Sequence, residues 1–182
     1  ELEPWLGPVK FKPEVNFSTD SVGLVHGLAW TSVGGEVLDV ECSVVPGSGK
    51  LELTGNLGDV MKESCQAAVT YIRSRTSELG IDPDFHKNTD IHLHFPEGAV
   101  PKDGPSAGAA ICLCVVSALT NRPVRADIAM TGEITLRGRV LAIGGLREKT
   151  MGALRAGVHT VLLPKENEKD LDEIDPLVRK KL

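Results

Sequence analysis

Long apolar runs and net positive charge are both missing from this sequence of 182 residues. No run approaches the 18 apolar residues of a membrane-spanning helix, and the first residues lack a signal-peptide core. The net charge of −5 leaves no overall basic field to attract nucleic acid. We therefore expect a cytoplasmic chain that binds neither membranes nor nucleic acid.

Cysteine is scarce, and its placement does not suggest a disulfide framework. Two disulfides are formally possible among Cys42, Cys65, Cys112 and Cys114. All four lie scattered through apolar segments, which favours buried free thiols in a reducing compartment over cross-links.

Complete metal and nucleotide motifs are also absent. Residues 46–50 read PGSGK, the end of a phosphate-binding loop, but Val44 replaces the first glycine and Leu51 replaces the magnesium-binding Ser or Thr. A hairpin turn is the better interpretation. His92 and His94 share one face of a predicted strand, as zinc ligands do, yet no third ligand stands at a suitable spacing. We expect no metal and no cofactor in this chain.

The most informative segment is residues 101–108, PKDGPSAG. Pro105 suits the first turn of a helix, and Asp103 is a good capping residue just before it. Ser106 would then lie where unpaired N–H groups and the positive end of the helix could stabilise an oxyanion. On these residues alone, a capped helix start with a merely small serine is an equally good explanation.

A serine nucleophile needs a base, and none of the five histidines has a suitable setting. Lys149, in GGLREK at 144–149, lies in the first turn of a predicted amphipathic helix. A lysine can act as the base if burial or a helix N-terminus lowers its pKa. Most lysines in such a position point into solvent, so Lys149 alone indicates little.

Together these segments closely resemble the proteolytic domain of Lon, the ATP-dependent serine protease with a Ser-Lys dyad. The resemblance includes GLAWT and GG within 27–35, MTGEITLRG at 130–138, and the 43-residue spacing from Ser106 to Lys149. It extends in order over roughly residues 22–170. The resemblance implies that Ser106 is the nucleophile and Lys149 the general base.

The resemblance also implies supporting residues near the dyad. Thr131 would orient Lys149 through its hydroxyl, although an ordinary strand threonine is the alternative. Asp103 would cap and shape the loop, or gate the site, rather than act as a catalytic acid. The oxyanion hole would use the backbone of Ser106, with a less certain contribution from the Pro101–Gly104 loop.

Other residues have weaker assignments. Glu41 and Glu97 match acidic positions near the site of the family. His92 and His94 would shape the strand that delivers the PKDGPSAG loop. Trp30 is expected in the core.

The predicted architecture is one compact α+β domain of the Lon protease type, with ribosomal-protein-S5-domain-2-like topology and small sheets packed with helices. Residues 1–20, rich in proline and charge, are expected to form a linker or a loosely attached start. Residues 21–182 would form the proteolytic domain, with its C-terminal end truncated. Strands are predicted at 22–31, 36–45, 51–54, 91–95, 128–131, 139–142 and 160–163, and helices at 58–79, 106–121, 146–157 and from 166 onward.

The expected function is that of a serine endopeptidase domain of an ATP-dependent Lon protease. ATP and Mg would bind in an ATPase module that this chain lacks, since no Walker motif is present. Unfolded or damaged proteins would be the substrates, and the full-length protein would form a homo-oligomeric, hexameric ring. Two alternatives stay open: an inactive Lon-like assembly module, and a small-molecule kinase of related topology.

Overall fold

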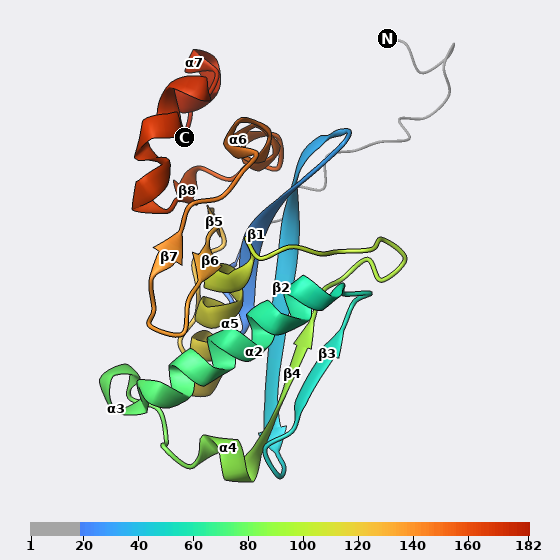
Figure 1. Ribbon diagram of the computed structural model, residues 1–182, viewed down its shortest axis with the longest axis vertical. Coiled ribbons are helices and arrows are strands. Elements are labelled where there is room, and N and C mark those ends of the chain that lie inside the picture. Colours follow the sequence, from blue (N-terminus) through green and yellow to red (C-terminus); the bar gives the residue numbers. More distant parts are fainter. Residues whose placement is uncertain (1–18) are drawn as a thin grey trace.

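The computed structural model describes residues 19–182 (Figure 1). The linker predicted for residues 1–20 therefore lies almost entirely outside the described residues. The strands are β1 (Leu24–Thr31), β2 (Gly34–Pro46), β3 (Leu51–Thr54), β4 (Thr89–His94), β5 (Ile128–Met130), β6 (Glu133–Ile134), β7 (Val140–Leu141) and β8 (Thr160–Leu162). The helices are α2 (Asp59–Ser74), α3 (Thr76–Leu79), α4 (Phe85–Asn88), α5 (Gly108–Thr120), α6 (Leu146–Arg155), the 3₁₀ helix η1 (Lys165–Glu173) and α7 (Pro176–Arg179).

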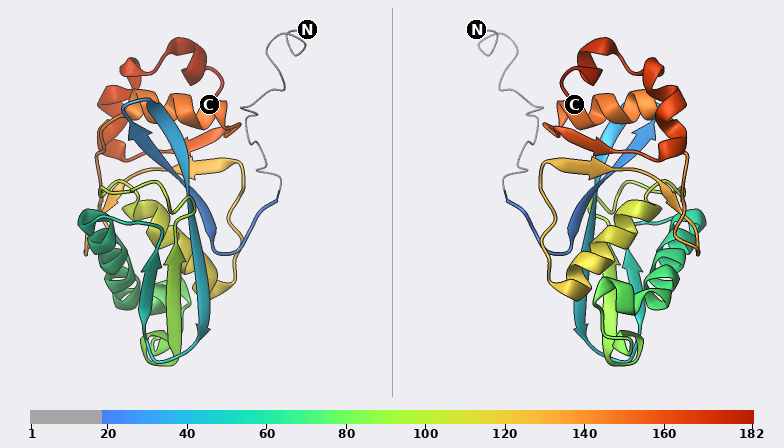
Figure 2. Two further views of the ribbon diagram at one scale, coloured as in Figure 1. Left: turned by 90° about the vertical axis from the view of Figure 1, so that its right-hand side faces the viewer. Right: turned by 90° about the vertical axis from the view of Figure 1, so that its left-hand side faces the viewer.

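Six strands form one mixed sheet in the order β3-β4-β2-β1-β5-β8, and β6 and β7 form a separate antiparallel pair. Helices α2 and α5 pack together on one face of the large sheet (Figure 2). Helix α6, η1 and α7 gather at the end of the molecule that holds the C-terminus (Figure 1). This arrangement confirms the expected fold, a single compact domain with a mixed sheet packed with helices.

Alternation along β1 and β2 divides the core between the two faces of the sheet. Val25 and Leu38 point into the main cluster under α2 and α5. Leu28 and Val37, which are register partners, point into a smaller cluster that includes Ala153 of α6. The strands therefore lie between α5, which follows Ser106, and α6, which carries Lys149.

Close backbone contact between α6 and β2 explains the second of the paired glycines at 34–35. The turn itself is made by Ser32 and Val33, because Thr31 pairs directly with Gly34. A Cβ on Gly35 would overlap the carbonyl oxygen of Glu148, and one on Gly152 would overlap the Gly35 backbone. Glycine at 35 and 152 therefore sets how closely α6 approaches the sheet.

The hairpin predicted at residues 46–50 is wrong. Strand β4 lies between β2 and β3, so the two strands that this segment joins are not neighbours. The segment instead wraps the Asp90 carboxylate, which accepts the N–H groups of Ser48, Gly49 and Lys50 at 2.8, 3.0 and 2.8 Å. The backbone N–H groups of the loop therefore donate to a carboxylate of the protein itself.

The prediction that the cysteines form no disulfide is confirmed, since all four thiols are free; Cys65, Cys112 and Cys114 are buried, whereas Cys42 is half-buried. Among residues 19–182, no helix is long and apolar enough to cross a membrane.

Candidate active site

Ser106 lies in a turn just before α5, two residues ahead of its first helical residue, Gly108. Its backbone is fixed by the segment after β5. The Ser106 carbonyl accepts the N–H of Gly132 at 2.7 Å, and the Gly132 carbonyl accepts the N–H of Ala109 at 2.9 Å. Gly132 leaves no room for a side chain, since a Cβ there would overlap Val140. The MTGE motif therefore positions the serine through its backbone.

Asp103 caps a different helix from the one expected. The residue at the N-cap of α5 is Ala107, with no side-chain cap. The Asp103 Oδ1 atom instead accepts the N–H of Met61, in the first turn of α2, at 3.0 Å, and that of Gly104 at 2.8 Å. The cause is backbone pairing of Lys102 with residues 56–58, which places Asp103 against α2.

Lys149, Ser106 and Thr131 meet at the centre of the site. Lys149 Nζ lies 3.0 Å from Ser106 Oγ and 3.1 Å from Thr131 Oγ1. The Thr131 hydroxyl donates in turn to the Ser106 carbonyl at 3.3 Å. Lys149 and Thr131 are only 2% and 1% exposed. The structure therefore brings together Ser106, Lys149 and Thr131, the three residues to which the resemblance assigned the strongest roles.

Burial lowers the pKa of the Lys149 amine to about 8 from its ordinary value of 10.5. Within residues 19–182, no carboxylate forms an ion pair with Lys149 that would restore the charged form. A pKa near 8 leaves an appreciable fraction of the amine neutral at neutral pH, as a general base requires.

Two backbone donors at and next to Ser106 are suitably placed for an oxyanion. Within the described part of the chain, the N–H groups of Ser106 and Ala107 have no protein acceptor. Both stand at the positive end of α5, where negative charge is favoured. The expected contribution from the Pro101–Gly104 loop is reduced, since Gly104 donates its N–H to Asp103.

A cavity of about 280 Å³ opens over the dyad. Its lining is largely apolar, with Asp103 and Glu133 as the acidic members. The lining residues are Leu28, Ala29, Trp30, Leu38, Met61, Asp103, Gly104, Pro105, Ser106, Ala107, Glu133, Ala142, Ile143, Gly144 and Lys149. Trp30 is 56% exposed, so its predicted core position is wrong. The aromatic ring instead forms part of the cavity wall.

The structure does not bring the remaining predicted residues to this cavity. His92 and His94 both contact Thr54 Oγ1, at 2.8 and 2.7 Å, and Glu41 is the register partner of His94. These side chains line a separate depression on the sheet. The histidines do belong to β4, which leads into the PKDGPSAG loop. No group of three or more possible metal ligands occurs among residues 19–182.

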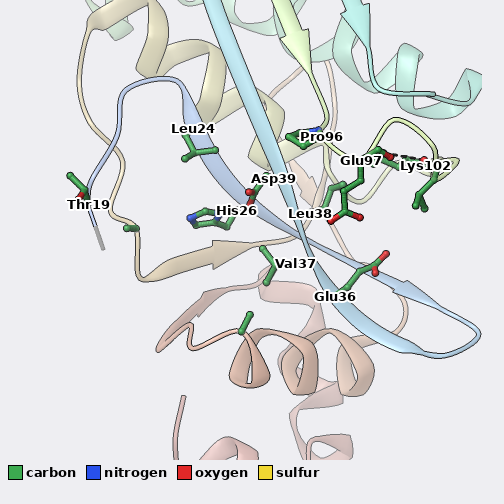
Figure 3. A pocket seen from close by; sticks show the side chains of 13 residues that line it. Thr19, Leu24, His26, Glu36, Val37, Leu38, Asp39, Pro96, Glu97 and Lys102 are labelled. Atoms are coloured by element: carbon green, nitrogen blue, oxygen red, sulfur yellow. Dashed lines mark hydrogen bonds and ion pairs between the residues drawn. The ribbon is translucent and has the colours of Figure 1, made fainter. Parts of the chain in front are cut away.

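Glu97 lines another pocket, of about 560 Å³, which is separate from the depression at His92 and His94 and lies beside the dyad cavity. Figure 3 shows Glu97 and Lys102 on the loop after β4, with His26 and Asp39 elsewhere along the same pocket. His26 Nδ1 is 2.7 Å from Asp39 Oδ1. The pocket contains charged side chains, and Ser106 does not line it.

Two kinds of comparison with known proteins point to the same family. The family described as Lon protease (S16) C-terminal proteolytic domain matches residues 1–182. The Lon protease of Brevibacillus choshinensis is 60% identical over 181 residues, which cover 100% of this chain and 23% of that protein. Lon protease 1 of Bacillus subtilis (strain 168) is 58% identical, with the same coverage. Lon protease 1 of Myxococcus xanthus is 57% identical over 178 residues, 98% of this chain and 22% of that protein.

The chain spans just under a quarter of the length of these curated relatives. Because the model of the C-terminal proteolytic domain matches the whole chain, the chain corresponds to that part of the relatives. The chain belongs to the Lon protease family, as its C-terminal proteolytic domain.

Proposed function

We propose that this domain is a serine endopeptidase that works through a Ser106–Lys149 dyad and an acyl-enzyme intermediate. The observation that carries the proposal is the 3.0 Å approach of a buried, partly neutral lysine amine to a serine hydroxyl. A neutral amine can accept the serine proton, whereas an ammonium cannot. The Thr131 hydroxyl takes up one amine N–H and so directs the nitrogen lone pair toward Ser106.

Acylation begins when Ser106 Oγ attacks the peptide carbonyl carbon and its proton passes to Lys149 Nζ. The carbonyl oxygen becomes negative and accepts the N–H groups of Ser106 and Ala107. The C–N bond then breaks as Lys149 gives the proton to the leaving amine. This leaves an ester between Ser106 and the acyl part of the substrate.

Deacylation repeats these steps with water as the nucleophile. Lys149 takes a proton from the water, which attacks the ester carbonyl, and then returns the proton to Ser106 Oγ. The same donors hold the second oxyanion. Each proton transfer passes through one amine, so the site needs no metal and no histidine for this sequence of steps.

The activity of the full-length protein is part of the same proposal. We expect unfolded or damaged proteins as substrates in the cytoplasm, and a homo-oligomeric, hexameric ring. ATP and Mg would act in a separate ATPase module. These expectations rest on the resemblance to Lon proteases.

Ser106→Ala tests the proposed function. The variant should fold normally and lose peptidase activity, as well as labelling by a peptide boronate. Ser48→Ala, which changes an exposed serine in the loop after β2, is the matched control and should retain both. Unchanged turnover by Ser106→Ala, in a preparation free of other proteases, would refute the dyad. Absence of labelling in the wild-type domain would favour an inactive assembly module.

A further inference from the structure

Asn167 is a buried polar side chain that the proposed chemistry does not use. It lies in η1 and is 1% exposed. Its Oδ1 atom accepts the N–H of Ile143 at 3.0 Å, and its Nδ2 group donates to the Ile143 carbonyl at 2.9 Å. The second N–H of the amide goes to Asp170 at 2.8 Å. The side chain therefore pairs with both backbone groups of one residue, as a neighbouring strand would.

This pairing fixes the direction of the adjacent backbone. One amide can bond both the N–H and the carbonyl of Ile143 only where that residue is extended. The peptide bonds on either side are trans, so the two groups of each point in opposite directions. The Ala142 carbonyl and the Gly144 N–H must therefore point away from Asn167.

Both groups are available on the side of the dyad cavity. Ala142, Ile143 and Gly144 all line that cavity. Within residues 19–182, neither the Ala142 carbonyl nor the Gly144 N–H has a hydrogen-bond partner. The Ala142 carbonyl is a hydrogen-bond acceptor and the Gly144 N–H is a donor, and they flank one extended residue. A strand edge pairs with another extended chain through this same pattern.

We propose that Asn167 is a positioning residue that holds residues 142–144 as a backbone docking edge for an extended peptide substrate beside Ser106. The inference rests on the proposed peptidase function and deepens it. Pairing through the main chain does not depend on substrate side chains, so such an edge suits unfolded chains of varied sequence. The Asn167 amide occupies the outer edge of Ile143 and leaves the inner edge for the substrate.

The first test compares peptide turnover with labelling of Ser106 by a small organophosphorus fluoride, which is too short to use the edge. Asn167→Asp and Asn167→Ala should lower kcat/KM for a fluorogenic peptide by about tenfold, mostly through KM. The labelling rate and its pH dependence should stay at wild-type values. The control Ile72→Val weakens the main core away from the cavity and should leave both readouts unchanged. Equal losses of labelling and turnover would overturn the positioning role.

A second test measures the substrate hydrogen bond directly. A set of peptides, each with one backbone amide replaced by an ester, removes one N–H donor at a time. In the wild-type domain, one replacement should lower kcat/KM about threefold to tenfold. That loss should disappear in Asn167→Ala, whose edge is no longer held. A loss of the same size in both proteins, or at no position, would contradict the proposal.

Gly144 offers a test that does not depend on the folding of Asn167 variants. A Cβ on Gly144 would meet no atom within 4 Å, and proline accepts an extended residue before it. Gly144→Pro removes the N–H that Gly144→Ala keeps, so its kcat/KM should be about tenfold lower than that of the alanine variant. Equal values would refute the docking edge. If wild-type Ser106 is not labelled at all, the proposed function fails instead.

Discussion

At the scale of single residues, the site depends on the Lys149 amine, which is buried away from solvent. Lys149 is almost fully buried, and its nitrogen contacts two hydroxyl groups rather than a carboxylate. Hydroxyl groups accept hydrogen bonds from the amine but lack the full negative charge by which a carboxylate would favour the ammonium form. Burial therefore lowers the pKa to about 8, which suits a base that must later act as an acid.

The lowered pKa makes stability depend on pH. The folded state holds fewer protons than the unfolded state between pH 8 and 10.5, so the free energy of unfolding should rise across this window. Lys149→Met should remove the rise and stabilise the domain below pH 8, by on the order of 3 kcal/mol. Urea unfolding at pH 7, 9 and 10.5 measures both effects. The same pH dependence in wild type and variant would contradict burial of a titrating amine.

Site roles could be predicted from the sequence for residues that stand in a recognisable motif. Contacts between residues far apart in the chain could not be predicted. Ser106, Thr131 and Lys149 stand in recognisable segments, and the structure brings them together. The partner of Asp103 is Met61, 42 residues away, and no local pattern indicates that contact. Asn167 stands in a charged segment with no motif, and its role depends entirely on where η1 packs.

At the scale of elements, the position of α6 controls the dyad. The helix begins at Leu146, directly after its N-cap Gly145, whose φ of 70° lies in the left-handed region, and its first turn carries Lys149. Its backbone then contacts β2 directly where Gly152 meets Gly35. Any side chain at this contact would push α6 away from the sheet and withdraw Lys149 from Ser106.

Gly152→Ala tests that contact. The added methyl group overlaps the Gly35 backbone, which should destabilise the domain by roughly 1–3 kcal/mol. Under conditions where the variant is fully folded, its peptidase activity should be more than tenfold lower than that of the wild type. Gly98→Ala is the control, because a Cβ there meets no atom within 4 Å. Thermal unfolding and peptide kinetics on both variants provide the comparison. Wild-type behaviour of Gly152→Ala would show that α6 can shift without cost.

Long periodic elements could be predicted from the sequence and short ones could not. The expected helix at 58–79 corresponds to α2 and α3, which end where Gly80 adopts a left-handed conformation. The four-residue helix α4 and the two-residue strand β6 are too short to show a period. The loop at 46–50 was misread because turn residues do not reveal whether the flanking strands pair.

At the scale of the whole molecule, family resemblance predicted the fold class, but the sheet order is visible only in the structure. Pairing of β1 with β5 joins segments about a hundred residues apart, and β4 lies between strands that precede it in the chain. Such long-range pairing depends on packing of the complete core. It also places α5 and α6 on either side of the strands, so that Ser106 and Lys149 meet.

The isolated domain should self-associate weakly. The three most exposed large apolar side chains among residues 19–182 lie at separate places, namely Val33 on the β1–β2 turn, Leu136 between β6 and β7, and Leu177 on α7. Contacts between unlike surfaces close into rings where the rotation allows. Sedimentation velocity over a range of concentrations should show association at the highest values. Strictly monomeric behaviour there would contradict self-association of the isolated domain.

The most direct measurement of the central claim is the pH dependence of Ser106 acylation in the intact domain. If Lys149 is the general base, the rate of labelling by an organophosphorus fluoride should rise through one ionisation near pH 8 and then level off. Lys149→Arg should not be labelled, because guanidinium does not release its proton. A midpoint near the ordinary lysine pKa of 10.5, or wild-type labelling of Lys149→Arg, would contradict the account.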